Sequence, residues 1–72
     1  MARLRVLSGW QVCEILSRNG IEELSQRGSH VNFMPPDGDL NRPLTVPLHR
    51  VVRPGTLVAI IRRSGLPREL FE

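Results

Sequence analysis

The apolar residues of this chain change their spacing at Gly20. Before that glycine, Val12, Ile15 and Leu16 recur at positions i, i+3 and i+4, which predicts an amphipathic helix over residues 9–19. Gly20 is its expected end, because glycine readily adopts the left-handed backbone that closes a last turn. After Gly20 the apolar and polar residues alternate with a period of two, which is typical of strands. The chain must therefore build a helix and then a sheet.

The start of the first helix also has a local signal. Ser8 and Gln11 have the spacing of a capping box, in which each side chain accepts a hydrogen bond from the backbone amide of the other residue. Leu7 and Val12 stand at the two positions of a hydrophobic staple. These signals place the beginning of the helix near residue 9.

Three short strands are predicted after this helix. The first lies within residues 21–27 and is weak, because two glutamates interrupt it; the others cover residues 30–34 and 44–46. Gly28 is the hinge between the first two strands. Pro47 ends the third, because its missing amide hydrogen suits a strand end or a sheet edge.

A second helix is predicted from Pro54, which is tolerated at a helix start, to Gly65 as its C-cap. Residues 66–71 are expected to add one short turn. The order helix, three antiparallel strands, helix predicts an α+β sandwich in which both helices cover one face of the sheet. Double-stranded-RNA-binding domains have the same α-β-β-β-α order. Residues 1–72 are expected to form one such domain.

The charge of the chain favours an anionic partner. Its ten basic residues, all arginine, outnumber seven acidic residues and give a net charge of +3. Arginine suits bidentate contacts with phosphate, although codon bias explains an all-arginine complement equally well. The single cysteine, Cys13, cannot form an internal disulfide and is expected to be a small buried hydrophobe. No apolar run has the length of a signal peptide or membrane span, so a cytoplasmic protein is expected.

Two histidine-bearing stretches are the main candidates for a functional site. Residues 26–30 read Gln-Arg-Gly-Ser-His, and residues 46–50 read Val-Pro-Leu-His-Arg. Histidine has an ordinary pKa near about 6.5, so it can both take and give a proton, whereas arginine stays charged and binds phosphate oxygens. A proton-transfer group beside arginines indicates chemistry on a phosphate backbone. These are the minimal parts of a metal-free ribonuclease.

Contacts to RNA are expected from residues close to the histidines: Arg27, Ser29, Arg50 and Arg53. The second histidine, His49, has three open roles, namely a further acid or base, a phosphate contact, or a residue that closes the loop after the third strand. No metal site or cofactor is expected, because Asp37 and Asp39 lie in one turn-forming stretch without a third ligand in sight.

Several motifs together resemble one family. The resemblance covers nearly the whole chain and rests on Ser8-Gly9, Gly20, Gln26-Arg27-Gly28-Ser29-His30, Pro36-Asp37-Gly38, Val46-Pro47-Leu48-His49 and Pro54-Gly55-Thr56-Leu57. The family is the HicA (YcfA-like) toxins. The resemblance implies one toxin domain of a type II toxin–antitoxin system, an mRNA interferase with a fold like double-stranded-RNA-binding domains. It also implies that His30 is the catalytic histidine and that a HicB-type antitoxin neutralises the toxin in a hetero-oligomer.

The sequence departs from the family pattern at two positions. Ile21 stands where an aromatic residue is usual, and Ser25 stands where an arginine usually precedes the Gln of the histidine motif. Glu22 and Glu23 add negative charge that a phosphate backbone avoids unless the two side chains point away from it. Two hypotheses lead: a metal-independent endoribonuclease toxin that cuts mRNA, and a non-catalytic RNA-binding module of the same fold. A third, more remote hypothesis is that the chain is stable only in complex with an antitoxin and that its basic face mainly binds an acidic surface of that partner. The sequence leaves the oligomeric state of the free chain open.

Overall fold

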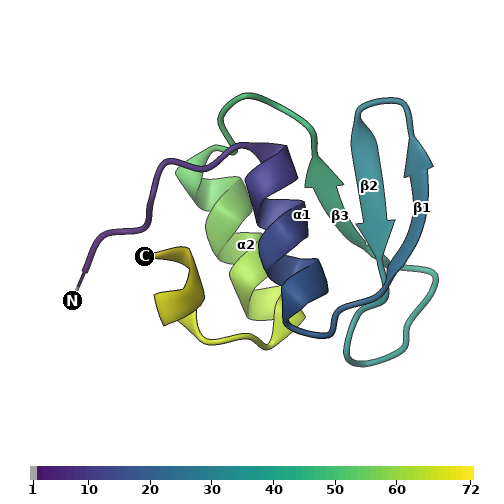
Figure 1. The fold of residues 1–72 in the computed structure, drawn as a ribbon. Helices are drawn as coiled ribbons and strands as arrows, with labels where there is room; N and C mark the ends of the chain where they lie inside the picture. Colours follow the sequence, from purple (N-terminus) through teal and green to yellow (C-terminus); the bar gives the residue numbers. More distant parts are fainter. Residues whose placement is uncertain (1) are drawn as a thin grey trace.

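The computed structural model describes residues 2–72 and arranges them as two α-helices and a three-stranded sheet (Figure 1). In chain order the elements are α1 (Gly9–Arg18), β1 (Glu23–Arg27), β2 (His30–Phe33), β3 (Leu44–Pro47), α2 (Pro54–Ser64) and the short 3₁₀ helix η1 (Arg68–Phe71). The strand order is β1-β2-β3, and both neighbouring pairs are antiparallel. The predicted α-β-β-β-α arrangement is confirmed, and η1 is the short turn expected after α2.

The ends of α1 follow the local signals. The Gln11 amide donates to Ser8 Oγ at 3.1 Å and the Ser8 amide donates to Gln11 Oε1 at 2.8 Å, so both bonds of the capping box are present. At the other end Gly20 has a φ of 85°, and the Ile21 amide donates to the Leu16 carbonyl at 3.0 Å. This left-handed closure ends the helix one residue before its predicted end.

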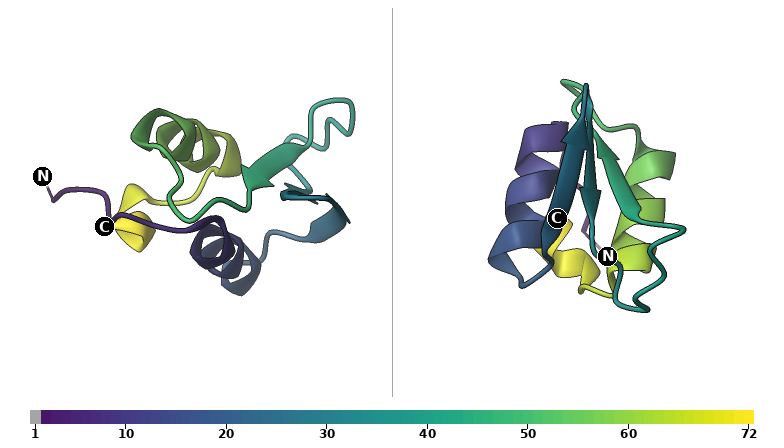
Figure 2. Two further views of the ribbon diagram at one scale, coloured as in Figure 1. Left: turned by 90° about the horizontal axis from the view of Figure 1, so that it is seen from above. Right: turned by 90° about the vertical axis from the view of Figure 1, so that its right-hand side faces the viewer.

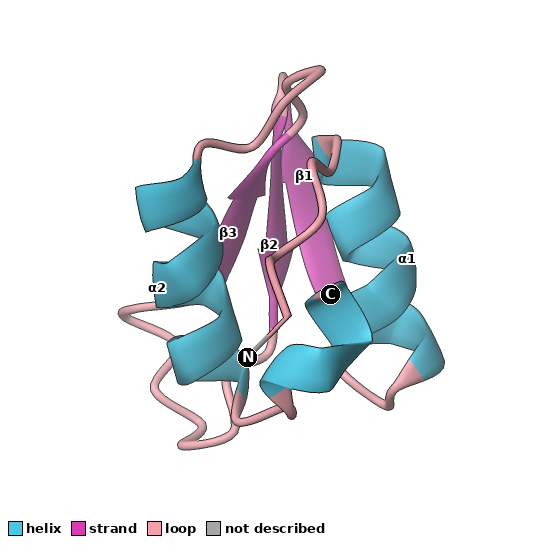
Figure 3. Ribbon diagram, turned by 90° about the vertical axis from the view of Figure 1, so that its left-hand side faces the viewer, coloured by secondary structure: helices cyan, strands magenta, loops and turns pink. Residues whose placement is uncertain are grey.

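Both helices cover the same face of the sheet, and the chain ends cover the helices (Figures 2 and 3). The N-terminal segment and η1 lie on the side of the helices that faces away from the sheet. The core therefore lies between the sheet and the helices and is closed from outside by Phe71, which is fully buried. Its buried apolar members come from every layer: Leu7, Val12, Leu16, Val31, Phe33, Leu44, Val46, Val52, Leu57, Ile60, Ile61 and Phe71.

The strands differ from their predicted bounds by one or two residues. β2 ends at Phe33, one residue early, and β3 includes Pro47, which pairs with His30. Proline fits there because β3 is an edge strand, where a missing amide hydrogen breaks no inner ladder. β1 begins at Glu23 and has an irregular register between Glu23 and Ser25.

Cys13 is half-buried, so the expectation of a buried residue is only partly met. Burial raises the pKa of its thiol to about 11, and the nearby charge of Glu23 adds to the shift. The thiol therefore stays protonated at neutral pH and is a poor nucleophile. Within residues 2–72, neither helix combines the length and the apolar character that crossing a bilayer requires.

Candidate functional site

The turn between β1 and β2 brings an arginine and a histidine together. Arg27 and His30 are Cα partners at the end of the hairpin, so only Gly28 and Ser29 form the loop. Gly28 has a φ of 55°, as the first loop residue of a type II′ turn requires. Residues directly opposite each other in an antiparallel pair share one face of the sheet, with Cβ atoms about 5 Å apart. Arg27 therefore stands beside His30.

The face that carries His30 is the one away from the helices, which we call the open face. In β2 the side chains of Val31 and Phe33 are buried toward the helices, while His30 is exposed and Asn32 is half-buried. Alternation along a strand then directs His30 and Asn32 to the open face. The candidate histidine is therefore accessible to a large substrate.

His49 lies next to His30. The two ring centroids are 6.5 Å apart, and the ring planes meet at 69°. Main-chain hydrogen bonds hold this arrangement: the Leu48 amide donates to the Ser29 carbonyl at 2.6 Å, and the Gly9 amide donates to the His49 carbonyl at 2.9 Å. The loop after β3 is thus held through the backbone carbonyl of His49. The imidazole ring of His49 is not needed for this contact.

Gly9 is a site-positioning residue that the sequence reasoning used only as part of a motif. A Cβ atom at Gly9 would lie 2.0 Å from the Pro47 carbonyl oxygen and 2.7 Å from the Leu48 Cα, both on the backbone. Only glycine allows the first turn of α1 to pack so closely on the chain that leads to His49. The available signal was a glycine at the first position of a helix, where residues with better helix propensity are normal.

The four predicted RNA contacts are not all in one place. Arg27 precedes the two-residue turn before His30, Ser29 lies in that turn, and Arg50 follows His49 directly. Arg53 precedes α2 directly and lies at the far end of the loop between β3 and α2. All four side chains are exposed. The ion pairs within residues 2–72 use other arginines, namely Arg18, Arg63 and Arg68.

A row of polar side chains crosses the open face next to the histidine. Asn32 pairs with Ser25 on one side and with Thr45 on the other. Its Nδ2 donates to Ser25 Oγ at 3.2 Å, and its Oδ1 accepts from Thr45 Oγ1 at 2.7 Å. The sequence reasoning missed this row, because strand alternation predicts a polar face but not which residues stand side by side. Ser25, the departure from the family pattern, is a member of it.

Glu22 and Glu23 stand at the start of β1, whereas Arg27, the partner of His30, stands at its end. Glu23 begins β1 and Arg27 ends it, which separates them by about 13 Å at roughly 3.3 Å per residue. Glu22 precedes the strand, and its carbonyl accepts from the Met34 amide at 2.8 Å. The negative charge is therefore remote from the histidine pair.

The predicted turn residues Asp37 and Asp39 serve the loop between β2 and β3. Asp37 Oδ1 accepts from the Asp39 amide at 2.9 Å, and Gly38 has a φ of 73°. The hydrogen bond from the Asp39 amide lowers the pKa of the Asp37 carboxyl, and the positive charge of Arg63, at 3.5 Å, adds to this effect. Residues 2–72 hold no group of three or more histidine, cysteine or acidic side chains arranged for a metal ion.

Comparison with known protein families identifies the chain. A family model described as the HicA toxin of bacterial toxin–antitoxin systems matches residues 9–66 of the 72-residue chain. The matched segment includes both histidines and the glycine at the start of α1. No curated protein sequence matches the chain significantly. The family match confirms the resemblance that the sequence motifs predicted.

Proposed function

Since this chain belongs to the HicA toxin family, we propose that it is an mRNA interferase, a metal-independent endoribonuclease whose catalytic residue is His30. It acts in the cytoplasm and is neutralised by a HicB-type antitoxin. The observation that carries this proposal is the pair of imidazole rings with centroids 6.5 Å apart, next to Arg27 on an exposed part of the sheet.

The proposed reaction uses the nucleophile that RNA itself carries. His30 takes the proton from a 2′-hydroxyl, and the 2′ oxygen attacks the adjacent phosphorus. The bond from phosphorus to the 5′ oxygen then breaks, and His49 supplies the proton that this leaving oxygen takes up. The products are a 2′,3′-cyclic phosphate and a 5′-hydroxyl. Each ring nitrogen must come within about 2.6–3.2 Å of the oxygen it serves, and two rings this close can reach oxygens of one phosphate.

Arginines stabilise the charge that develops on the phosphate. Arg27 is the nearest by strand register, and Arg50 is adjacent to His49 in the chain. Charge-assisted, bidentate contacts of this kind hold phosphate oxygens firmly and stabilise the extra negative charge of the pentacoordinate state. Ser29 and Arg53 extend the contact along the loops, and the row through Asn32 offers hydrogen-bonding groups to the rest of a single strand.

The antitoxin inhibits by covering the histidines. Within residues 2–72, η1 and the N-terminal segment both lie on the side of the helices that faces away from the sheet, so neither covers the open face. A partner interface of ordinary size takes about 800 Å² from each side. Acidic or hydrogen-bonding groups of the antitoxin then compete with phosphate for Arg27 and the rings.

The test is His30→Ala. We expect loss of growth arrest on induction and a fall of about 10²–10⁴-fold in the cleavage rate of purified mRNA, measured in the presence of a chelator. Because His30 is exposed, the circular dichroism spectrum and melting temperature should match those of the unaltered chain. Full toxicity of a folded His30→Ala chain contradicts the mechanism. RNA that is retarded but never cut by the unaltered chain supports the alternative, a non-catalytic RNA-binding module.

A further inference from the structure

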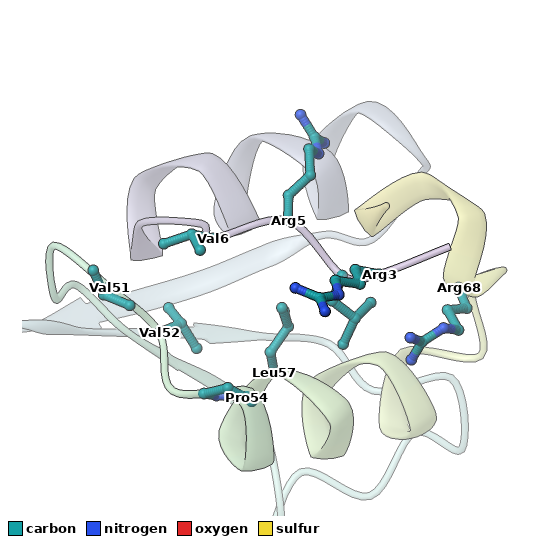
Figure 4. A pocket seen from close by; sticks show the side chains of 9 residues that line it. Arg3, Arg5, Val6, Val51, Val52, Pro54, Leu57 and Arg68 are labelled. Atoms are coloured by element: carbon teal, nitrogen blue, oxygen red, sulfur yellow. The ribbon is translucent and has the colours of Figure 1, made fainter. Parts of the chain in front are cut away.

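A pocket of about 290 Å³ lies between the N-terminal segment, the loop from β3 to α2, and α2 itself (Figure 4). Its floor is apolar and includes the buried side chains of Val52 and Leu57. Its edge carries Val6, which is 79% exposed, and Val51, which is 50% exposed. The Val52 amide donates to the Leu7 carbonyl at 2.8 Å and thereby holds the two valine-bearing segments together.

The pocket also has a cationic rim. Arg3 and Arg68 extend over it, while Arg5 points away toward α1 (Figure 4). Arg68 is held in place by its ion pair with Glu72, with Nε and Oε2 3.0 Å apart, and Arg3 is not part of any ion pair within residues 2–72. None of the nine lining residues is acidic. Because Arg68 is already paired with Glu72, Arg3 is the cation of this rim with which an incoming carboxylate would pair. An occupant that places a carboxylate beside an apolar group would match this rim.

We propose that the pocket is a docking site for the antitoxin, which inserts an aliphatic side chain next to a carboxylate that pairs with Arg3. The proposal rests on the proposed function only in taking the antitoxin as the partner protein, and the family itself is one of toxin–antitoxin systems. Val6 and Val51 form a small exposed apolar surface at the edge of the pocket, which an apolar side chain of a partner can cover. Side chains that fill a well-packed pocket from which water is excluded contribute much of the binding energy of protein interfaces, and complementary charges around them favour the right partner.

Protein is a better occupant than RNA for a chemical reason. Unstacked bases bind on aromatic rings or on flat guanidinium groups. None of the nine lining residues is aromatic, and the arginines stand at the rim of the pocket rather than on its apolar floor. The floor and the edge are formed by branched aliphatic side chains. An aliphatic side chain of a partner packs on these surfaces without losing a hydrogen bond.

One side of the pocket belongs to the loop between β3 and α2, which also carries His49. Val51 follows Arg50, and His49 precedes both. An antitoxin segment that fills the pocket therefore lies next to the chain that carries His49. Docking in the pocket binds the antitoxin without a contact to His30. The affinity for the antitoxin and the covering of the histidines therefore depend on different residues of the toxin.

The experiment compares Val51→Asp with Leu40→Asp. Leu40 is 61% exposed, lies in the loop between β2 and β3, and is not a lining residue of the pocket. The probe is the purified product of the reading frame adjacent to this chain's gene, and its affinity is measured by calorimetry. We expect Val51→Asp to weaken binding at least tenfold and Leu40→Asp to leave it within twofold, with unchanged melting temperatures and RNA cleavage for both.

A charge reversal tests the rim. Arg3→Glu is expected to weaken antitoxin binding about tenfold, while Arg18→Glu, on the exposed surface of α1, is expected to change it less than threefold. Antitoxin affinity that is unchanged by Val51→Asp overturns the proposal, and so does a Val51→Asp chain that loses RNA affinity while still binding the antitoxin. An unaltered chain that binds the antitoxin through the pocket but does not cut RNA contradicts the nuclease and leaves the docking site standing.

Discussion

The two faces of the sheet use the same strands for different purposes. In β2, Val31 and Phe33 face the helices and are 3% and 0% exposed, whereas His30 and Asn32 face outward. Because side chains alternate, a strand of four residues supplies both the core and the candidate catalytic group. Residues for stability and residues for the candidate site are therefore separated here by the direction of their side chains rather than by distance along the chain.

β1 differs from β2 in that all five of its side chains are exposed. Its place depends on backbone pairing with β2 and on the two-residue turn, since it contributes no fully buried side chain to the core. The strand that carries Arg27 is thus held mainly by its ladder. Changes on β1 should therefore alter function before they alter the fold.

The strongest test of the comparison is to alter neighbours that face opposite ways. Phe33→Ala is expected to lower the free energy of unfolding by about 3–5 kcal/mol, because it leaves a cavity in a fully buried position. Asn32→Ala removes exposed hydrogen bonds to Ser25 and Thr45 and should cost about 1 kcal/mol.

Urea unfolding followed by circular dichroism measures both changes. A small domain has only a few kcal/mol of stability, so Phe33→Ala should be largely unfolded at 37 °C. Equal losses for the two variants would contradict the division of the sheet into a core face and an open face.

Much of the fold was predictable because its signals are local. The capping box at Ser8 and Gln11 and the closure at Gly20 depend on residues within a few positions, and the structure reproduces both. The outward direction of His30 follows from the same alternation that buries Val31. The strand bounds were less accurate, because pairing with a neighbour, and not composition, includes Pro47 in β3.

The geometry of the site was less predictable, because it depends on contacts between distant segments. The approach of His49 to His30 needs the bond from the Leu48 amide to Ser29 and the close packing of Gly9. No periodicity in the sequence encodes either contact. The hydrogen-bonded row through Asn32 likewise depends on the register of three strands, which only the assembled sheet defines.

Gly9→Ala tests whether the packing of α1 also determines the position of His49 at the open face. The added methyl would overlap the Pro47 carbonyl, so the loop or the helix must move, at a cost of about 1–3 kcal/mol in stability. We expect the cleavage rate to fall about 10–100-fold as His49 moves relative to His30. Chemical denaturation and single-turnover cleavage report the two effects.

Gly55→Ala is the matched control for this substitution. Gly55 is also within the first turn of a helix, and a Cβ there meets no atom of residues 2–72 within 4 Å. The free energy of unfolding of the Gly55→Ala chain should stay the same or rise by about 0.5–1 kcal/mol, and its rate of RNA cleavage should not change. If Gly9→Ala behaves like Gly55→Ala, the close packing of α1 does not position His49.

The smallest expected effect concerns a charge on the open face. Arg27→Gln removes one phosphate contact from a strand that the core does not hold, so the free energy of unfolding should change by less than about 0.5 kcal/mol. The salt dependence of RNA binding should weaken by about 0.7 in the slope of log K against log salt concentration, the value for one contact to a single strand. Fluorescence anisotropy with labelled RNA at several salt concentrations measures the slope.

Arg18→Gln is the control. Arg18 already pairs with Glu14 at 2.9 Å on α1, so its loss should leave the slope unchanged. Equal changes for the two arginines would mean that RNA responds to net charge alone, and the open face would then have no special part in binding.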